Sequence, residues 1–255
     1  MEWNKTFAQT GTYKFHSLAN EVITMKIREE GLVSVVIPCY NAALFIEECL
    51  NGLLFQTYKN IEVILVNDAS TDHTMEIVEQ WIKKSNPPFP LILCNLPVNM
   101  GFAGALTAGY FMSSGEYIAV NDADDISDPS RFEKQVEFLL ENPDYDLVGT
   151  NYRAFNNGSK EKGKEADWLH YGEAIRKVYA AGKHCVCHGT ILFHGRVFDV
   201  LGGPTRRITG AEDYEFIVKF LNANLKIDNL REVLYYYRLH DKQRSKEFYG
   251  SDKSG

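Results

Sequence analysis

The sequence predicts an α/β fold in which a doubly wound, mostly parallel central sheet carries helices on both faces. Up to residue 122, short apolar runs alternate with segments whose apolar residues recur at helical spacing. Strands that are apolar throughout are typical of parallel sheets covered on both sides. With 255 residues, 45% of them hydrophobic and 24% charged, the chain fits one large domain better than two small ones.

Each expected element of the first half follows from its own pattern. Runs rich in Val, Ile and Leu predict strands at 32–38, 61–68, 91–95 and 116–122. The segments between them have helical periodicity and predict helices at 42–56, 72–84 and 101–114. Ligands of such sheets bind beyond the carboxyl ends of the strands. Polar residues stand at these ends and predict a ligand site: Asn41, Asp68 and Asp122.

The second half of the chain is less regular. Its pattern predicts helices at 129–140, 171–182 and 210–224, and strands at 189–194 and 233–240. A polar, loop-rich segment covers 151–168. Because long loops inside compact domains are usually functional, we expect substrate contacts there.

Composition and charge exclude several classes of protein. The formal net charge of −7 and the pI near 5.5 argue against general binding to nucleic acid or anionic lipid. Five cysteines without a disulfide-scaffold spacing, and an N-terminus without a signal segment, indicate a reduced, cytoplasmic protein. No apolar run approaches the roughly 20 residues of a membrane-spanning helix. Peripheral contact with the inner face of a membrane and homo-oligomerisation stay open.

The segment VNDADDISDP places four carboxylates directly after a predicted strand: Asp122, Asp124, Asp125 and Asp128. Such groups repel one another unless they are solvated, protonated or neutralised by a cation. One interpretation is a solvated acidic turn in which Asp128 or Ser130 caps the next helix. The other is a site for Mg²⁺ or Mn²⁺, which completes its shell with phosphate oxygens and water. The place at the carboxyl edge of the sheet favours a cation held by Asp122 and Asp124 on a diphosphate.

Two interpretations also apply to Asp68, which ends a buried strand. Its carboxylate can accept hydrogen bonds from the imide or hydroxyl groups of a ligand, or it can cap a helix, since the segment NDASTDHT is rich in capping residues. The segment 99–109, which contains Gly101, lacks both the Rossmann order of glycines and a Walker lysine. We expect it to pack a helix closely against the sheet near the ligand.

Charged residues near the C-terminus supply further candidates. Glu212 and Asp213 begin a predicted helix, where they either complement the helix dipole or provide a general base opposite the metal. Arg238, His240 and Arg244 form either an exposed basic tail or contacts to a leaving diphosphate, with His240 as a further cation ligand.

The histidine- and cysteine-rich segment HCVCHGTILFH does not have the spacing of a structural zinc site. His188 is either a contact in an acceptor-facing loop or a hydrogen-bonded structural histidine.

Six segments in order from about Val33 to Ser245 resemble the family 2 glycosyltransferases, inverting enzymes with the GT-A fold: VSVVIPCYN, ILVNDASTD, NMGFAGALTAG, GEYIAVNDADD, GAEDYEF and YYRLHDKQRS. The resemblance implies a GT-A domain in which the DXD motif, Asp122 to Asp124, meets the ribose and the metal that bridges the diphosphate. It implies that Asp213 is the base. The implied nucleotide-binding residues, with uracil the usual base, are Pro38, Tyr40, Asn41, Asp68, Gly101 and Asp122. The residues left as candidate contacts to the diphosphate or the acceptor are His188, Glu212, Arg238 and Arg244.

The departures from the family pattern narrow the expected activity. Leu106 and Thr107 replace the Arg and Asn that often follow Ala in the glycine segment, and a QxxRW motif is absent. We therefore expect a transferase that adds a single sugar from a UDP-sugar to a glycan or lipid-linked acceptor. The expected cofactor is Mn²⁺ or Mg²⁺, and the expected process is the synthesis of a cell-surface polysaccharide or glycolipid. The alternatives are a sugar-nucleotide pyrophosphorylase and a non-catalytic nucleotide- or glycan-binding module.

On this interpretation the chain divides into four parts. They are an N-terminal arm at 1–30, a nucleotide-sugar-binding half at 31–125, an acceptor-binding and catalytic half at 126–245 and a C-terminal tail at 246–255.

Overall fold

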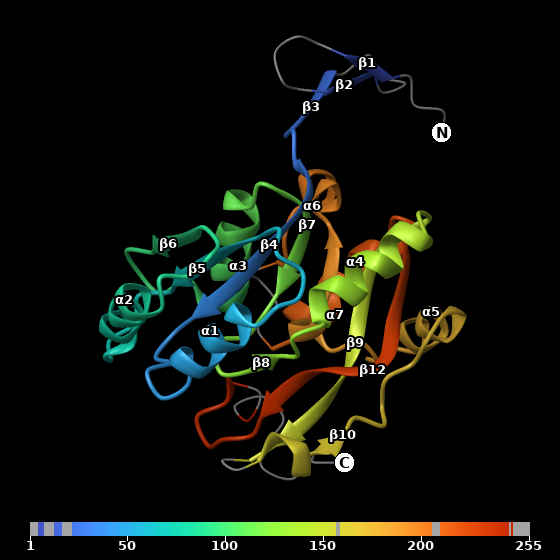
Figure 1. Ribbon diagram of the computed structural model, residues 1–255. Helices are drawn as coiled ribbons and strands as arrows, with labels where there is room; N and C mark the ends of the chain where they lie inside the picture. Colours follow the sequence, from blue (N-terminus) through green and yellow to red (C-terminus); the bar gives the residue numbers. More distant parts are fainter. Residues whose placement is uncertain are drawn as a thin grey trace.

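The computed structural model describes residues 5–7, 13–16, 22–156, 159–205, 210–244 and 246 (Figure 1). Its strands are β1 Lys5–Phe7, β2 Tyr13–His16, β3 Val22–Met25, β4 Glu29–Cys39, β5 Ile61–Asn67, β6 Leu91–Asn95, β7 Gly115–Val120, β8 Ile126–Ser127, β9 Tyr145–Phe155, β10 Lys164–Glu165, β11 Leu192–His194 and β12 Lys226–Arg238. Its α-helices are α1 Ile46–Leu54, α2 Thr74–Ser85, α3 Gly101–Met112, α4 Arg131–Glu141, α5 Glu173–Ala180, α6 Gly195–Leu201 and α7 Glu212–Asn222, and its 3₁₀ turns are η1 Lys160–Lys162 and η2 His188–Thr190.

The main sheet has the strand order β6-β5-β4-β7-β11-β9-β12-β8, and β10 pairs with β9. Strands β6, β5, β4 and β7 are parallel, as are β9 and β12, while the short β11 runs antiparallel between β7 and β9. The predicted α/β class with a mostly parallel sheet and helices on both faces is therefore confirmed. Within the expected N-terminal arm, β1, β2 and β3 form a separate antiparallel sheet. Most of the expected C-terminal tail, 247–255, lies outside the described residues.

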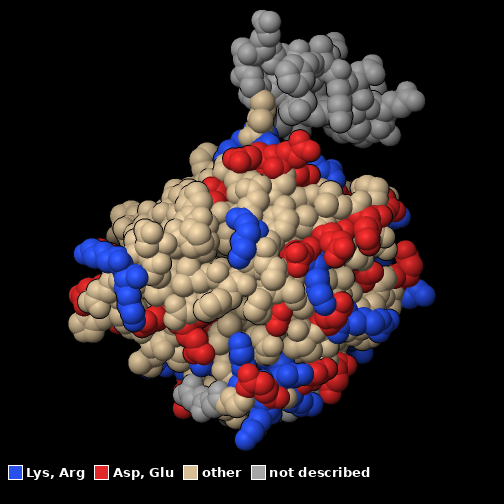
Figure 2. Space-filling view, in the orientation of Figure 1, with Lys and Arg blue, Asp and Glu red and all other residues tan. Residues whose placement is uncertain are grey.

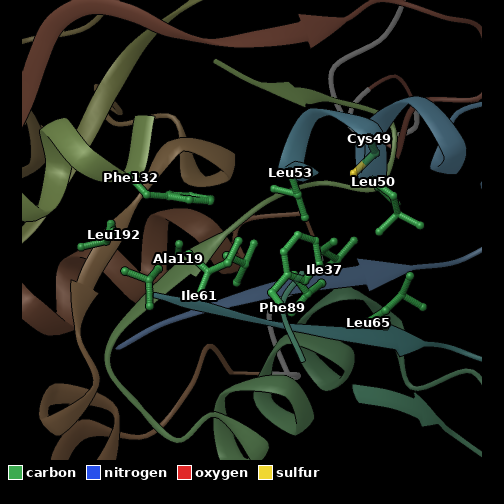
Figure 3. Packing of buried hydrophobic residues seen from close by; sticks show 14 of the residues in the cluster. Ile37, Cys49, Leu50, Leu53, Ile61, Leu65, Phe89, Ala119, Phe132 and Leu192 are labelled. Atoms are coloured by element: carbon green, nitrogen blue, oxygen red, sulfur yellow. The ribbon is translucent and has the colours of Figure 1, made fainter. Parts of the chain in front are cut away.

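Alternate residues of the strands face two separate cores. Along β4, Val35 and Ile37 join the core beneath α1, α2 and α4, part of which Figure 3 shows, while Val36 joins the core beneath α3, α5, α6 and α7. A Cβ atom on Gly109 of α3 would lie 2.3 Å from Val36 Cγ1, so only glycine lets this helix approach the sheet so closely. This observation confirms the close helix packing expected of the segment 99–109.

The second half differs from the prediction in three places. Residues 145–155 form the long central strand β9, although a polar loop was expected from 151, and β12 begins at Lys226 instead of at residue 233. Both strands are secured by their parallel pairing with each other, which side-chain polarity does not reveal. Helix α6 was not predicted, because its seven residues are too few for a periodic signal.

The surface on the side shown in Figure 2 carries acidic and basic side chains interspersed with one another. Among the helices in the described part of the chain, none combines the length and the apolar character needed to cross a bilayer.

Candidate active site

The acidic segment after β7 supplies two carboxylates to the fold and two to the site. Asp128 Oδ1 accepts the N–H of Ser130 at 3.0 Å, just before α4. Asp125 is 1% exposed, and its Oδ1 accepts the N–H of Arg238 at 2.7 Å. The capping role considered for Asp128 is thus observed, and Asp122 and Asp124 are left for other partners.

Asp122 lies in an electrostatically unfavourable position. Its N–H donates to the hydroxyl of Tyr235 at 3.0 Å, but its buried Oδ1 has no hydrogen-bond partner among the described residues. Burial, with the nearby charge of Asp124, raises the pKa of Asp122 to about 7. An anionic oxygen without a partner in this place would be stabilised by a cation or a hydrogen-bond donor.

Asp124 meets His240, although 116 positions separate them in the sequence. His240 Nε2 lies 2.8 Å from Asp124 Oδ2, and the imidazole is 9% exposed. Because His240 Nδ1 accepts the N–H of Lys242 at 3.2 Å, we place the ring proton on Nε2, which donates it to Asp124. The structure therefore brings together the two residues predicted as metal ligands.

These two residues fit a magnesium or manganese site that is completed by substrate. An imidazole nitrogen and a carboxylate oxygen meet at one point, and His240 also lines a cleft of about 390 Å³ with Leu44, Phe45, Arg238, Asp241 and Lys242. Within the parts of the chain that the structure describes, no cluster of three His, Cys, Asp or Glu residues could hold a metal by itself. Mg²⁺ usually takes only one or two carboxylates from the protein and fills its shell with phosphate oxygens and water.

Arg238 holds the acidic segment in place. Its Nε donates to the carbonyl oxygen of Asp124 at 2.9 Å, and its guanidinium pairs with Glu48 and lies over the ring of Phe155. The residue is only 5% exposed. A contact between Arg238 and a diphosphate stays a prediction.

The first turn of α7 separates its two predicted carboxylates into different roles. The side chain of Glu212 is 8% exposed, pairs with Arg244 and accepts the N–H of Gly210 at 2.9 Å. Asp213 is 33% exposed, and its Oδ1 accepts the N–H of Tyr214 at 2.7 Å. Glu212 thus ties the C-terminal segment to the helix, whereas Asp213 remains accessible to a substrate.

His184, which was not among the predicted site residues, faces Asp213. Its Nε2 lies 3.6 Å from Asp213 Oδ2, and its Nδ1 lies 2.8 Å from the hydroxyl of Tyr179. Burial raises the pKa of Tyr179, so its hydroxyl is protonated and can hydrogen-bond to either tautomer of His184; the tautomer with its proton on Nε2 would present that proton toward Asp213. The ring of Trp168 stacks on His184 at 5.2 Å and fixes its plane. The segment HCVCH offered two histidines, and sequence reasoning selected only the second.

His188, the predicted one, is 6% exposed and packs edge-on against the rings of Phe102 and Phe216. Neither ring nitrogen has a hydrogen-bond partner among the described residues. The hydrogen bonds expected of a structural histidine are therefore not found among the described residues, and the role of His188 as a substrate contact stays a prediction.

Arg131 is a second site residue that sequence reasoning missed. It is fully buried at the start of α4, where its guanidinium donates to the carbonyl oxygen of Val120 at 2.7 Å and to Ser127 Oγ at 2.9 Å. Burial lowers its pKa to about 10, so it stays protonated near neutral pH. It secures the strand end from which Asp122 emerges. In the sequence, nothing distinguishes it from an exposed arginine near the start of a helix.

Asp68 is 3% exposed and caps a helix, but not the next one in the chain. Its two carboxylate oxygens accept the N–H groups of Met100 at 2.6 Å and Gly101 at 2.9 Å, at the start of α3. The following helix, α2, is capped by Asp72, which accepts the N–H of Thr74 at 3.0 Å. Gly101 itself has a φ of +75°, which explains a glycine there.

The remaining residues predicted to bind the nucleotide lie at the end of β4. Pro38 is paired with Val66 in the sheet, and Tyr40 is 51% exposed. Asn41 has a φ of +51°, and its side-chain oxygen accepts the N–H of Thr71 at 2.8 Å. This contact joins the loops after β4 and β5 at the carboxyl edge of the sheet.

Solved structures of other proteins share this fold. TarS 1-349 of S. aureus in complex with UDP-GlcNAc is 22% identical and superposes with a TM-score of 0.68, covering 85% of this chain and 61% of that one. The mannosyltransferase PcManGT of Pyrobaculum calidifontis, in complex with GDP-Man and Mn²⁺, is 23% identical with a TM-score of 0.65, covering 82% and 57%. The chain thus spans about six tenths of the length of these two solved chains, and the likeness shows the GT-A fold.

Sequence comparison identifies the family. The putative glycosyltransferase EpsE of Bacillus subtilis is 34% identical over 208 residues, which cover 81% of this chain and 72% of EpsE. The model of the family described as "Glycosyl transferase family 2" matches residues 34–202, which include the acidic segment and η2. The chain therefore belongs to glycosyl transferase family 2.

Proposed function

We propose that this chain transfers a sugar from a nucleotide-diphospho-sugar to a hydroxyl group of a glycan or lipid-linked acceptor, with inversion at the anomeric carbon. The contact between Asp124 and His240 carries this proposal. It joins a carboxylate and an imidazole, from two distant segments, at the carboxyl edge of the sheet. This edge is where nucleotide ligands bind in open α/β sheets.

Asp213 is the proposed general base. Its carboxylate would accept the proton of the acceptor hydroxyl while that oxygen forms a bond to the anomeric carbon. The bond between this carbon and the diphosphate oxygen breaks, and the nucleoside diphosphate leaves with the electron pair. The N–H of Tyr214 orients Oδ1 of Asp213, and His184 lies beside Oδ2.

A divalent cation would be held by Asp124 and His240, with Asp122 nearby. When bound, it would neutralise the charge that develops on the departing diphosphate. For this purpose His240 must present a deprotonated Nε2, so the cation would replace the present hydrogen bond between the two side chains. The complex of PcManGT with Mn²⁺ supports the choice of manganese as the first cation to test.

We propose UDP as the nucleotide. Each carboxylate oxygen of Asp68 accepts one backbone N–H and keeps lone-pair capacity for a second donor, such as a uracil imide. The TarS complex with UDP-GlcNAc supports this choice, while the PcManGT complex with GDP-Man names the competing base.

The test is a turnover assay with UDP-GlcNAc and GDP-Man, each with and without Mn²⁺ and with an acceptor glycan. Release of nucleoside diphosphate together with an inverted glycoside is expected, and it should disappear in Asp213→Asn. Binding without turnover on any donor and acceptor would instead identify a non-catalytic module. Membership of the glycosyltransferase family argues against a pyrophosphorylase, and release of nucleoside triphosphate from donor and pyrophosphate would reverse that conclusion.

A further inference from the structure

Three buried polar atoms of the candidate site lack a hydrogen-bond partner among the described residues. They are Nδ1 and Nε2 of His188 and Oδ1 of Asp122. Buried polar groups nearly always have partners, because losing water without replacement costs free energy. Such atoms in a protein interior therefore call for an explanation, and a ligand that completes their hydrogen bonds is one.

The unpartnered atoms belong to one neighbourhood. Gly189 follows His188 directly, and a Cβ atom there would lie 2.6 Å from Asp122 Oδ2 and 2.8 Å from the hydroxyl of Tyr235. Only a glycine lets the carboxylate lie this close to η2. The charge of Asp213 also reaches both groups, since it adds to the rise in the pKa of Asp122 and partly offsets the lowering of the pKa of His188 by burial. His188, Asp122 and the proposed base Asp213 thus lie near enough to one another for the charge of Asp213 to act on the other two.

The surroundings of His188 limit what its nitrogens can bind. Two phenyl rings, those of Phe102 and Phe216, pack edge-on against the imidazole and accept no conventional hydrogen bond. Burial lowers the pKa of His188 to about 4, so the ring is neutral near pH 7 and offers one donor and one acceptor. A phosphate would offer only acceptors and would be repelled by Asp122. A sugar hydroxyl both donates and accepts, and so it matches the pair.

We infer that His188 hydrogen-bonds a hydroxyl group of the transferred sugar, beside Asp122, and thereby selects among donor sugars. This inference rests on the proposed function. It names a residue that contacts the transferred sugar, which the proposed function does not. It also moves His188 from the contacts to the diphosphate or the acceptor, among which it was predicted, to the donor sugar. A site with polar groups that stay unpaired without the correct hydroxyl discriminates strongly against sugars that lack it.

The test compares a nucleotide with its nucleotide-sugar in His188→Phe, which keeps an aromatic ring but removes both nitrogens. Affinities are measured by calorimetry with Mn²⁺, using UDP and UDP-GlcNAc or, if the wild type prefers them, GDP and GDP-Man. We expect nucleotide affinity to stay within about twofold of the wild type. Affinity for the nucleotide-sugar should fall about 10-fold, the equivalent of one hydrogen bond of about 1.4 kcal/mol. His188→Gln, which retains a donor and an acceptor, should recover part of the loss.

Each outcome bears on one of the two claims. If the wild type binds no nucleotide and no nucleotide-sugar, the proposed function fails and the inference fails with it. If the wild type binds both but His188→Phe loses no nucleotide-sugar affinity, the inference alone is overturned. An equal loss for nucleotide and nucleotide-sugar overturns it as well, because the ring would then support the diphosphate or the fold. If the phenyl ring does not fit, the smaller His188→Leu replaces it in the same comparison.

Discussion

Replacement of Asp213 by asparagine separates catalysis from helix stabilisation at the start of α7. Asparagine keeps the acceptor oxygen that faces the N–H of Tyr214, at 2.7 Å in the structure, but it has no basic oxygen. The side chain is 33% exposed, so the loss of charge at the helix N-terminus should cost only about 0.3 to 1 kcal/mol of unfolding free energy. Loss of a general base should lower turnover by at least about 10²-fold.

The control is Glu215→Gln, which removes a carboxylate from the same first turn. Glu215 pairs with Lys219 at 3.2 Å and accepts the N–H of Thr205, so it has structural partners of its own. Steady-state turnover and thermal unfolding of both variants are compared with those of the wild type. Similar losses of stability, with a large rate loss in Asp213→Asn alone, are expected. A folded Asp213→Asn protein that keeps more than about a tenth of wild-type turnover would refute the assignment.

Three further predictions concern the metal, the buried arginine and the dependence of stability on pH. Asp124→Ala should abolish the Mn²⁺-dependent part of UDP affinity without unfolding the protein, and undiminished dependence in calorimetry would place the cation elsewhere. Arg131→Met leaves the carbonyl of Val120 and the hydroxyl of Ser127 without their buried donor, so it should lower the unfolding free energy by about 3 kcal/mol in denaturant titrations; a loss below about 1 kcal/mol would contradict this. Burial lowers the pKa of His188 from 6.5 to about 4, so between these values the unfolded chain binds a proton that the folded chain does not. Stability should therefore fall as the pH falls through this window, and the wild type should lose about 3 kcal/mol more than His188→Phe between about pH 7 and pH 4. Parallel stability profiles for the two proteins would contradict this.

Most of the first half of the fold could be predicted because β5 and β7, and β4 from Val33 on, are buried on both faces and so read as apolar runs. Strand β9 violates this rule, since its second half ends in NYRAF while it lies between β11 and β12. Its place depends on pairing with residues some eighty positions away, a contact that no local pattern contains.

The residues of the candidate site also divide into those that a local sequence pattern reveals and those that depend on distant contacts. Asp124 was predictable because it follows a strand end, where the polar groups of such sheets gather, and His240 was selected because charged residues cluster in its segment. Capping was one of the two interpretations of Asp68, but the helix that it caps, α3, begins more than thirty residues later, a partner that a local search for caps does not reach. Arg131 and His184 could not be distinguished from other arginines and histidines, because their roles come from tertiary neighbours.

The contact that joins Asp124 to His240 also sets the order in which the protein can become active. During synthesis the strands β4 to β7 emerge first, yet the imidazole lies beyond β12 and arrives only after it. Contacts between residues far apart in the sequence are slow to form, because a long loop must close before they are made. A nascent chain released before residue 240 would hold half of the proposed cation site. If Asp124 and His240 hold the cation as proposed, sugar transfer during refolding should begin only once β12 has paired with β9, so its onset should report the completion of the sheet and not the collapse of its first half.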